Sequence, residues 1–336
     1  MMKKQLLTAL VALGASTMSW AEVNIYSYRQ EFLIKPMLEA FTKESGIPVN
    51  IVYVKDGLAD RLKQEGELSK ADVVLTVDIS RLEELVAAGV TQPFTSDVVN
   101  ANIPAHLRGE HWAALTTRAR AIYSSKERVG KLPASFTYQD LAKPELKGKV
   151  CVRSGKHPYN VSLVASMIAR DGEAAAKAWL EGVKANLAQK PQGGDRDQVK
   201  AIMEGKCDYS LGNSYYFGAM LNNEKNPEQK EWAKAVEINF PNQESTGTHV
   251  NVSGVALAKH APNRADALKL IEFLSGDAAQ EMYAEVNHEY PVKAGVKRSD
   301  LVASWGDFKA DDLNVLEIAK HYQSALKLID EVKFDM

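Results

Sequence analysis

Two kinds of hydrophobic periodicity alternate over residues 23–89. Val23–Ser27 alternates apolar and polar residues, which predicts a strand, and Glu31–Ser45 carries apolar residues three and four positions apart, which predicts a helix. The same order then repeats, with strands expected at 49–54 and 72–77 and helices at 58–68 and 80–88. Because strands that alternate with helices pair in parallel through crossover connections, this region predicts an α/β domain.

Two extended runs, at 111–123 and 249–258, are long enough to leave one domain and enter another. A second strand–helix alternation is expected around them, with strands at 148–152, 209–211 and 236–241 and helices at 163–170, 173–187, 197–204, 265–274, 277–285 and 314–332. The predicted layout is therefore two α/β lobes joined by two crossing strands. In such a layout a ligand binds between the lobes, at the carboxyl ends of strands.

The crossing strands also predict where the lobes begin and end. We expect lobe 1 to contain residues 22–117 and about 250–300, and lobe 2 to contain residues 118–249. Helices from about 301 to 336 are expected to pack on the lobes. No internal repeat or low-complexity segment interrupts this arrangement.

The first 21 residues are typical of a secretory signal peptide. Lys3 and Lys4 precede a short apolar run at 6–15, and Ser19-Trp20-Ala21 supplies small residues where a signal peptidase cleaves. The apolar run is shorter than the roughly 20 residues that a membrane-spanning helix needs. We therefore expect export to the periplasm, where conditions are oxidising.

The chain has two cysteines, Cys151 and Cys207. An even number in an exported protein favours a disulfide, with two buried free thiols as the alternative. Two cysteines alone cannot make a zinc site, and none of the seven histidines stands in an HExxH or HxxxH pattern.

The composition and charge of the chain exclude several classes of protein. The chain of 336 residues is 45% hydrophobic and 25% charged, which is ordinary for a globular protein and excludes a disordered or collagenous one. Its formal charge of −2 gives no basic excess for nucleic acid or an anionic membrane. The Gly212-Asn213-Ser214 segment resembles the start of a GxSxG nucleophile elbow, but Tyr216 occupies the final glycine position, so an enzyme is not indicated.

An adjacent tyrosine pair, Tyr215 and Tyr216, follows the strand expected at 209–211. Neighbouring side chains on a strand point to opposite faces, whereas in a loop or first helical turn both can reach one ligand. Gly212-Asn213-Ser214 predicts a turn and helix cap here. Taken alone, however, an aromatic pair at a strand end more often packs into the core.

A third tyrosine, Tyr159, also lies between an expected strand and helix, in the same lobe. Three phenols that converge suit a trivalent hard cation, because Fe(III) prefers oxygen ligands and its charge displaces the phenolic protons. Three phenolates would neutralise one Fe(III) ion. Tyr159, Tyr215 and Tyr216 are therefore the candidate metal ligands.

Two arginines complete a candidate anion site. Arg29 follows the first strand, and Arg118 lies in the first crossing strand, so both border the expected cleft. Guanidinium groups bind a small dianion such as carbonate through paired hydrogen bonds, and this anion would fill the remaining metal positions. Ser154 and Asn213 are additional candidate hydrogen-bond donors to the anion.

From about Val23 to its C-terminus, the chain resembles the bacterial periplasmic ferric-iron-binding proteins, which carry iron to ABC importers. The resemblance rests on Tyr-Ser-Tyr-Arg-Gln at 26–30, Gly-Glu-Leu-Ser-Lys-Ala-Asp-Val at 66–73, Thr-Thr-Arg-Ala-Arg at 116–120, Asn-Ser-Tyr-Tyr at 213–216 and His-Glu-Tyr-Pro-Val at 288–292. It implies a type II periplasmic-binding-protein fold, Fe(III) bound by the three tyrosines, and delivery by a monomer to an inner-membrane ABC permease.

The chain also departs from part of that family. Some members add a histidine and a glutamate from the first lobe to the metal, whereas this sequence has Gln30 and Val77 at the matching places. Other members use a further tyrosine from the first-strand segment, which Tyr26 or Tyr28 would supply. An anion-assisted site agrees better with charge balance. The alternative function is a binding protein of the same fold for an oxyanion, a polyamine or thiamine.

Overall fold

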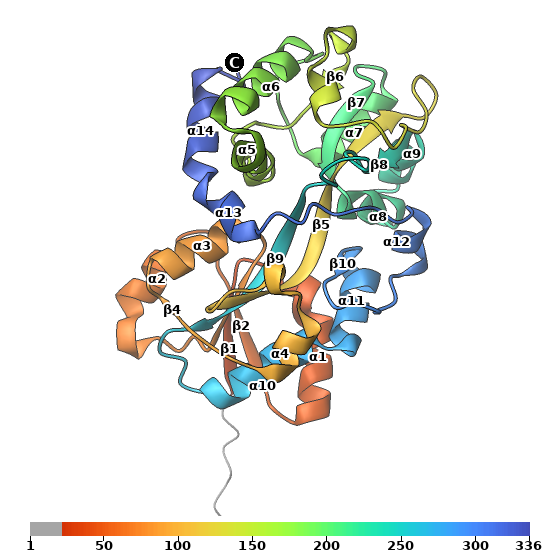
Figure 1. The fold of residues 1–336 in the computed structure, drawn as a ribbon. Helices are drawn as coiled ribbons and strands as arrows, with labels where there is room; N and C mark the ends of the chain where they lie inside the picture. The colour runs from red at the N-terminus through yellow and green to blue at the C-terminus, as the bar shows by residue number, and fades with distance from the viewer. Residues whose placement is uncertain (1–21) are drawn as a thin grey trace, which may run out of the picture.

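The computed structural model describes residues 22–336, so the expected signal peptide at 1–21 lies outside the described residues. Figure 1 shows two lobes, one above the other, with the long strands β5 (Trp112–Ser125) and β9 (Val250–Ala258) running between them. Across residues 22–336, no helix combines the length and the apolar character needed to cross a bilayer.

The first lobe begins with a parallel sheet in which β1 (Val23–Ser27) lies between its two neighbours. The strands and helices that follow are β2 (Val49–Tyr53), β3 (Val73–Thr76), α1 (Glu31–Ser45), α2 (Leu58–Glu65) and α3 (Ile79–Ala87). These elements confirm the expected strand–helix order. The helix expected at 58–68 ends earlier, at Glu65, because Gly66 takes a positive φ of 51° and a 3-10 turn, Gly66–Leu68, follows.

The two crossing strands pair with each other in antiparallel register and join the lobes through one continuous ten-stranded sheet. The first half of β5 also pairs with β10 (Tyr290–Pro291), and its second half pairs with β7 (Tyr209–Asn213) and β8 (Val236–Asn239). β9 in turn pairs with β3 and with β4 (Thr91–Gln92). Both long extended runs are therefore single strands shared by two lobes, as the sequence predicted.

The second lobe pairs β6 (Val150–Cys151) in parallel with β7 and covers these strands with helices. The helices are α5 (Pro158–Asp171), α6 (Glu173–Ala185), α7 (Asp195–Met203), α8 (Tyr215–Leu221) and α9 (Glu228–Lys234), with 3-10 turns at Gln139–Ala142 and Pro144–Leu146. A disulfide joins Cys151 to Cys207, which confirms the expected pairing and ties β6 to the segment before β7.

The other helices complete the lobes and connect them. They are α4 (Asp97–Asn102), the 3-10 turn Ala105–Leu107, α10 (Arg264–Ser275), α11 (Asp277–Asn287), α12 (Asp300–Ser304), α13 (Val315–Lys320) and α14 (Tyr322–Glu331). The single helix expected at 314–332 is thus two helices. α13 packs on α3 and α5, whereas α14 packs on α5 and α6, so the chain turns between them. Buried Val315 belongs to the core of the first lobe and Ile318 to that of the second.

Candidate functional site

A cavity of about 530 Å³ lies at the crossing strands, between the lobes. Its walls include the three candidate metal ligands, both candidate anion-binding arginines, Tyr28, and side chains that the sequence did not single out, such as Ser253 and Glu289. The lining includes the turn after β1, the start of α1, parts of β5 and β9, the first turns of α5, α7 and α8, and the end of α11 with the residues that follow it. Segments far apart in the chain therefore meet at one polar hollow.

Tyr159 is held in the first turn of α5 by local sequence. His157 caps the helix by accepting a hydrogen bond from the Tyr159 N–H at 3.3 Å, and Pro158 occupies the first helical position, where its missing N–H costs nothing. The positive end of the α5 dipole therefore lies close to this phenol. Such a position favours a negative charge on the side chain.

Tyr215 and Tyr216 begin α8, directly after β7. In β7, Asn213 lies opposite Arg120, and the Ser214 N–H then donates to the Ala119 carbonyl at 2.9 Å. The chain turns into a helix at this point, so the two rings need not point to opposite faces as they would on a strand. Their centroids are 4.2 Å apart, and both rings line the cavity.

The phenols of different helices also meet. The Tyr159 and Tyr215 hydroxyl oxygens are 3.2 Å apart. Burial raises the pKa of Tyr159 to about 12, with a further increase from Tyr216 and an opposing decrease from Arg118. Burial likewise raises the pKa of Tyr215 well above the ordinary range. Both groups are therefore neutral near pH 7 until a cation binds.

Two guanidinium groups converge on one hydroxyl beside the phenols. Arg29 and Arg118 donate to the Ser253 Oγ at 2.7 and 2.8 Å, and Arg29 also pairs with Glu289 at 2.7 Å. Burial is the largest single effect and would lower the Arg29 pKa, but the charge and hydrogen bond of Glu289, together with Tyr283 and Tyr215, outweigh it, and the pKa is raised. Arg118 is only 2% exposed, and its Nε and Nη2 have no hydrogen-bond partner within the described chain. Buried donors of this kind favour an anionic ligand.

The remaining candidate residues form hydrogen bonds within the protein, and only some of them line the cavity. Ser154 donates to the Asp335 carboxylate at 2.6 Å, and the Asn213 side-chain oxygen accepts from Arg120 at 3.2 Å, while the Asn213 Nδ2 has no hydrogen-bond partner among residues 22–336. Neither residue lines the cavity. Tyr28 does line the cavity, but its hydroxyl accepts from the Leu58 N–H at 2.9 Å. Tyr26 is directed to Glu65, at 3.3 Å, outside the lining.

The sequence missed a third arginine in the wall. Arg196, in the first turn of α7, places its guanidinium carbon 5.4 Å from the centre of the Tyr216 ring. Its position next to the helix start after Gly193-Gly194 was the only available signal, and nothing in the local pattern connects it to a tyrosine twenty residues later. Ser253 and Glu289 were missed for the same reason, since their partners come from distant segments.

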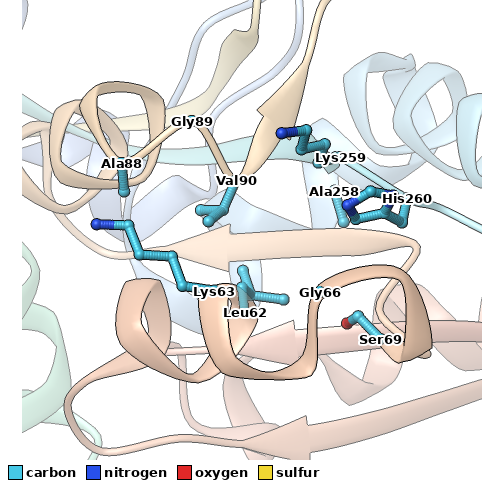
Figure 2. Close-up of a pocket in the computed structure, with 10 residues that line it drawn as sticks. All are labelled: Leu62, Lys63, Gly66, Ser69, Ala88, Gly89, Val90, Ala258, Lys259 and His260. Carbon is cyan, nitrogen blue, oxygen red and sulfur yellow. The ribbon is translucent and has the colours of Figure 1, made fainter.

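A second, shallower hollow of about 190 Å³ lies on the first lobe (Figure 2). It is bordered by the ends of α2 and α3 and by the end of β9, and its ionisable side chains are Lys63, Lys259 and His260. None of the candidate ligands contributes to it. The cavity between the lobes is therefore the one that combines the expected chemistry with the expected place.

A polar cavity between two lobes, set over strands that cross from one lobe to the other, defines a bilobed binding protein for a small solute. Residues 69–307 match the family model described as "Bacterial extracellular solute-binding protein", and the chain belongs to this family. The fold is the type II periplasmic-binding-protein fold that the sequence predicted. The family consists of transport proteins rather than enzymes.

Similar proteins carry names that refer to iron. The chain is 44% identical to Iron uptake protein A1 of Synechocystis over 92% of its own length and 86% of the relative's. It is 63% identical to the Mannheimia haemolytica ferric iron-binding protein A, solved in an open conformation, with a TM-score of 0.90 over 94% and 99% of the two chains. A Trichodesmium protein solved with iron and citrate ligands is 40% identical, with a TM-score of 0.89 over 93% and 99%.

Proposed function

We propose that this protein captures Fe(III) in the periplasm through the phenolates of Tyr159, Tyr215 and Tyr216. The observation that carries the proposal is the 3.2 Å separation of the Tyr159 and Tyr215 oxygens, with Tyr216 beside them in the same cavity. Two neighbouring oxygens of an octahedral ion with bonds of about 2.1 Å are roughly 3.0 Å apart. Little movement is then needed for both oxygens to bind one ion.

A small anion, carbonate or bicarbonate, would complete the coordination on the side of Arg29 and Arg118. The support for this is that Arg118 is buried with two unpartnered nitrogens, as far as residues 22–336 show. A dianion bound there would satisfy these donors and occupy positions on the metal that the three phenolates leave open. The Trichodesmium relative, solved with iron and citrate, makes a carboxylate anion the natural comparison in the same experiment. Tyr28 remains a possible additional ligand if its bond to Leu58 breaks.

Capture would proceed from the open form. Fe(III) and the anion meet the phenols on the second lobe, the phenols lose their protons, and the first lobe closes over the ion by movement at β5 and β9. Closure needs a ligand that binds the closed form more tightly than the open one, and Arg29, on the first lobe, supplies such a contact. The closed monomer would then deliver iron to an inner-membrane ABC permease.

The proposal is tested by the visible absorption spectrum of the purified protein. Addition of ferric citrate is expected to produce a phenolate-to-iron charge-transfer band and a pink to orange colour. The same titration with and without bicarbonate separates a site that requires bicarbonate from one that is completed by citrate or by the protein alone. The absence of a band under both conditions would contradict tyrosine ligation and would favour another solute for this fold.

A further inference from the structure

Arg120, in β5, is one of the largest fully buried side chains of the protein and does not line the cavity. It lies two positions beyond Arg118, so both side chains leave the strand on the same face. Arg118 reaches the cavity, and Arg120 lies one step further into the second lobe, behind the tyrosines. A buried guanidinium is retained only where hydrogen bonds and an opposite charge compensate its lost hydration.

The contacts of Arg120 reach three separate segments. Its Nη2 donates to the Asn160 Oδ1 at 2.6 Å, and its Nη1 donates to the Asp195 carboxylate at 2.7 Å and to the Asn213 Oδ1 at 3.2 Å. Asp195 is 1% exposed, and desolvation alone would raise its pKa, but Arg120 and Arg153 hold that pKa below the ordinary value. Arg120 and Asp195 therefore form a buried ion pair in which both groups are charged.

Each of these segments carries part of the candidate site. Asn160 follows Tyr159 in α5, and Asn213 precedes Tyr215 by two positions. Asp195 also accepts the backbone N–H of Asn213 at 2.8 Å, so it fixes the end of β7 from which the tyrosine pair emerges. The guanidinium of Arg120 and the carboxylate of Asp195 thus connect α5 to the start of α8.

We propose that Arg120, together with Asp195, is a positioning residue that sets the distance between the phenol of Tyr159 and that of Tyr215. The inference rests on the proposed function and deepens it, since it assigns the geometry of the metal site to groups that never touch the metal. The planar guanidinium can hold Asn160 and Asn213 at once, because its donors point in fixed, diverging directions. A lysine ammonium has one nitrogen at the end of a flexible chain and cannot reproduce that span.

The same network acts on the charge of the phenol. The guanidinium carbons of Arg153, Arg118 and Arg120 lie 5.4, 5.6 and 6.0 Å from the centre of the Tyr159 ring. Positive charge close to the ring stabilises the phenolate that a metal ion requires. Moving or redirecting Arg120 therefore changes the position of the Tyr159 oxygen and the charge around its ring, and both effects change the energy of phenolate-to-iron charge transfer.

The test compares Arg120→Lys with Asn160→Ala in full-length mature protein titrated with ferric citrate. Arg120→Lys keeps the positive charge but loses the paired, diverging donors of the guanidinium. Asn160→Ala removes the bond from Arg120 to α5, together with the Asn160 Nδ2 bonds to the Arg153 and Ser154 carbonyls, and leaves no buried carboxylate unpaired. In both variants we expect a shifted charge-transfer maximum and at least a tenfold loss of iron affinity in competition with citrate. If Arg120→Lys does not fold, Asn160→Ala still tests whether the bond from Arg120 to α5 sets the position of the Tyr159 phenol.

A matched control comes from the turn that follows β5, in the same lobe. Arg128 pairs with Asp208 and donates to the carbonyls of Ile202 and Cys207, away from the cavity, so Arg128→Lys is expected to lower thermal stability and leave the band and the affinity unchanged. The inference is overturned if Asn160→Ala and any folded Arg120→Lys protein keep the wild-type band position and affinity. A wild-type protein with no band would instead contradict the tyrosine ligation itself, and the positioning role with it.

Discussion

The phenolic oxygens of Tyr159 and Tyr215 lie 3.2 Å apart, although 56 positions separate the two residues in the chain. Each stands in the first turn of a helix that follows a strand of the second lobe, and the two helix starts face one cavity. Burial keeps both phenols neutral in the absence of a cation, since it raises the pKa of each. The pair is thus arranged so that one bound ion can replace the protons of both phenols.

Removal of one phenolic oxygen tests the ligand assignment most directly. Tyr215→Phe and Tyr216→Phe are each expected to weaken Fe(III) binding by at least roughly 100-fold, because mutation of groups that only support metal ligands already costs about 10- to 100-fold. The fold should persist, since each change deletes a single oxygen. Competition with citrate gives the affinity, and circular dichroism gives the fold.

Tyr209→Phe is the control for these variants, because Tyr209 lies on β7 outside the cavity lining. It should keep both the iron affinity and the absorption band. Wild-type affinity in the Tyr215 and Tyr216 variants would remove these residues from the ligand set.

Arg118 gives a second test, directed at the anion. Arg118→Gln removes a buried guanidinium that has two unpartnered nitrogens within the described residues, so the anion loses its strongest donor. We expect iron binding in this variant to be weaker and to depend less on bicarbonate than in the wild-type protein. Arg170→Gln, which alters an ion pair with Asp311 outside the cavity, should leave that dependence unchanged. An undiminished bicarbonate effect in Arg118→Gln would argue against an anion role for Arg118.

Iron affinity should fall as the pH falls. The pKa of Tyr159 is raised to about 12 and that of Tyr215 is raised well above its ordinary value, so the iron-free protein holds both protons at pH 7. Each phenol that binds Fe(III) must release one proton, and added protons therefore compete with the metal. We expect about three protons released per ion for three phenolate ligands, measured by pH-stat titration against a buffer blank. Tyr159→Phe should release one fewer, and an equal count would exclude Tyr159 as a phenolate ligand.

The disulfide should affect stability but not the site. Cys151 and Cys207 are buried in the second lobe and lie 56 positions apart in the chain, a loop for which closure entropy corresponds to about 4 kcal/mol. The double variant Cys151→Ser/Cys207→Ser is expected to unfold at lower urea concentration, by up to that free energy. Its absorption band with iron should match the wild type. A changed band at full folding would show that the disulfide also shapes the cavity.

Much of the fold could be predicted because its signals are local. The helix at Glu31–Ser45 and the strand at Val23–Ser27 were predicted with the observed bounds, since each has a clear hydrophobic period and a terminating residue. The helix expected at 314–332 has a continuous apolar pattern and is nevertheless two helices. Its turn depends on which helices of the two lobes it packs against, and that information is absent from the local sequence.

The same contrast between local and long-range signals applies to the candidate site. Tyr215 and Tyr216 were found because they are adjacent after a predicted strand, and Tyr159 because it follows another. Arg196 and Ser253 carry no such signal, and they became visible only when distant segments met at one cavity. Asn213 was expected to donate to the anion; the register of β7 against β5 brings its Oδ1 to Arg120, and the residue does not line the cavity.

By itself, then, the sequence determined the α/β alternation, the two long crossing strands and the phenols that suit a trivalent cation, because these follow from periodicity and side-chain chemistry. Only the tertiary structure decided that the hydroxyls of Tyr159 and Tyr215 meet and that Arg29 and Arg118 both donate to Ser253. It also decided that Arg120, outside the cavity lining, bonds to Asn160. These contacts join residues separated by tens to hundreds of positions. Their geometry arises from sheet register and helix packing, which depend on the whole chain at once.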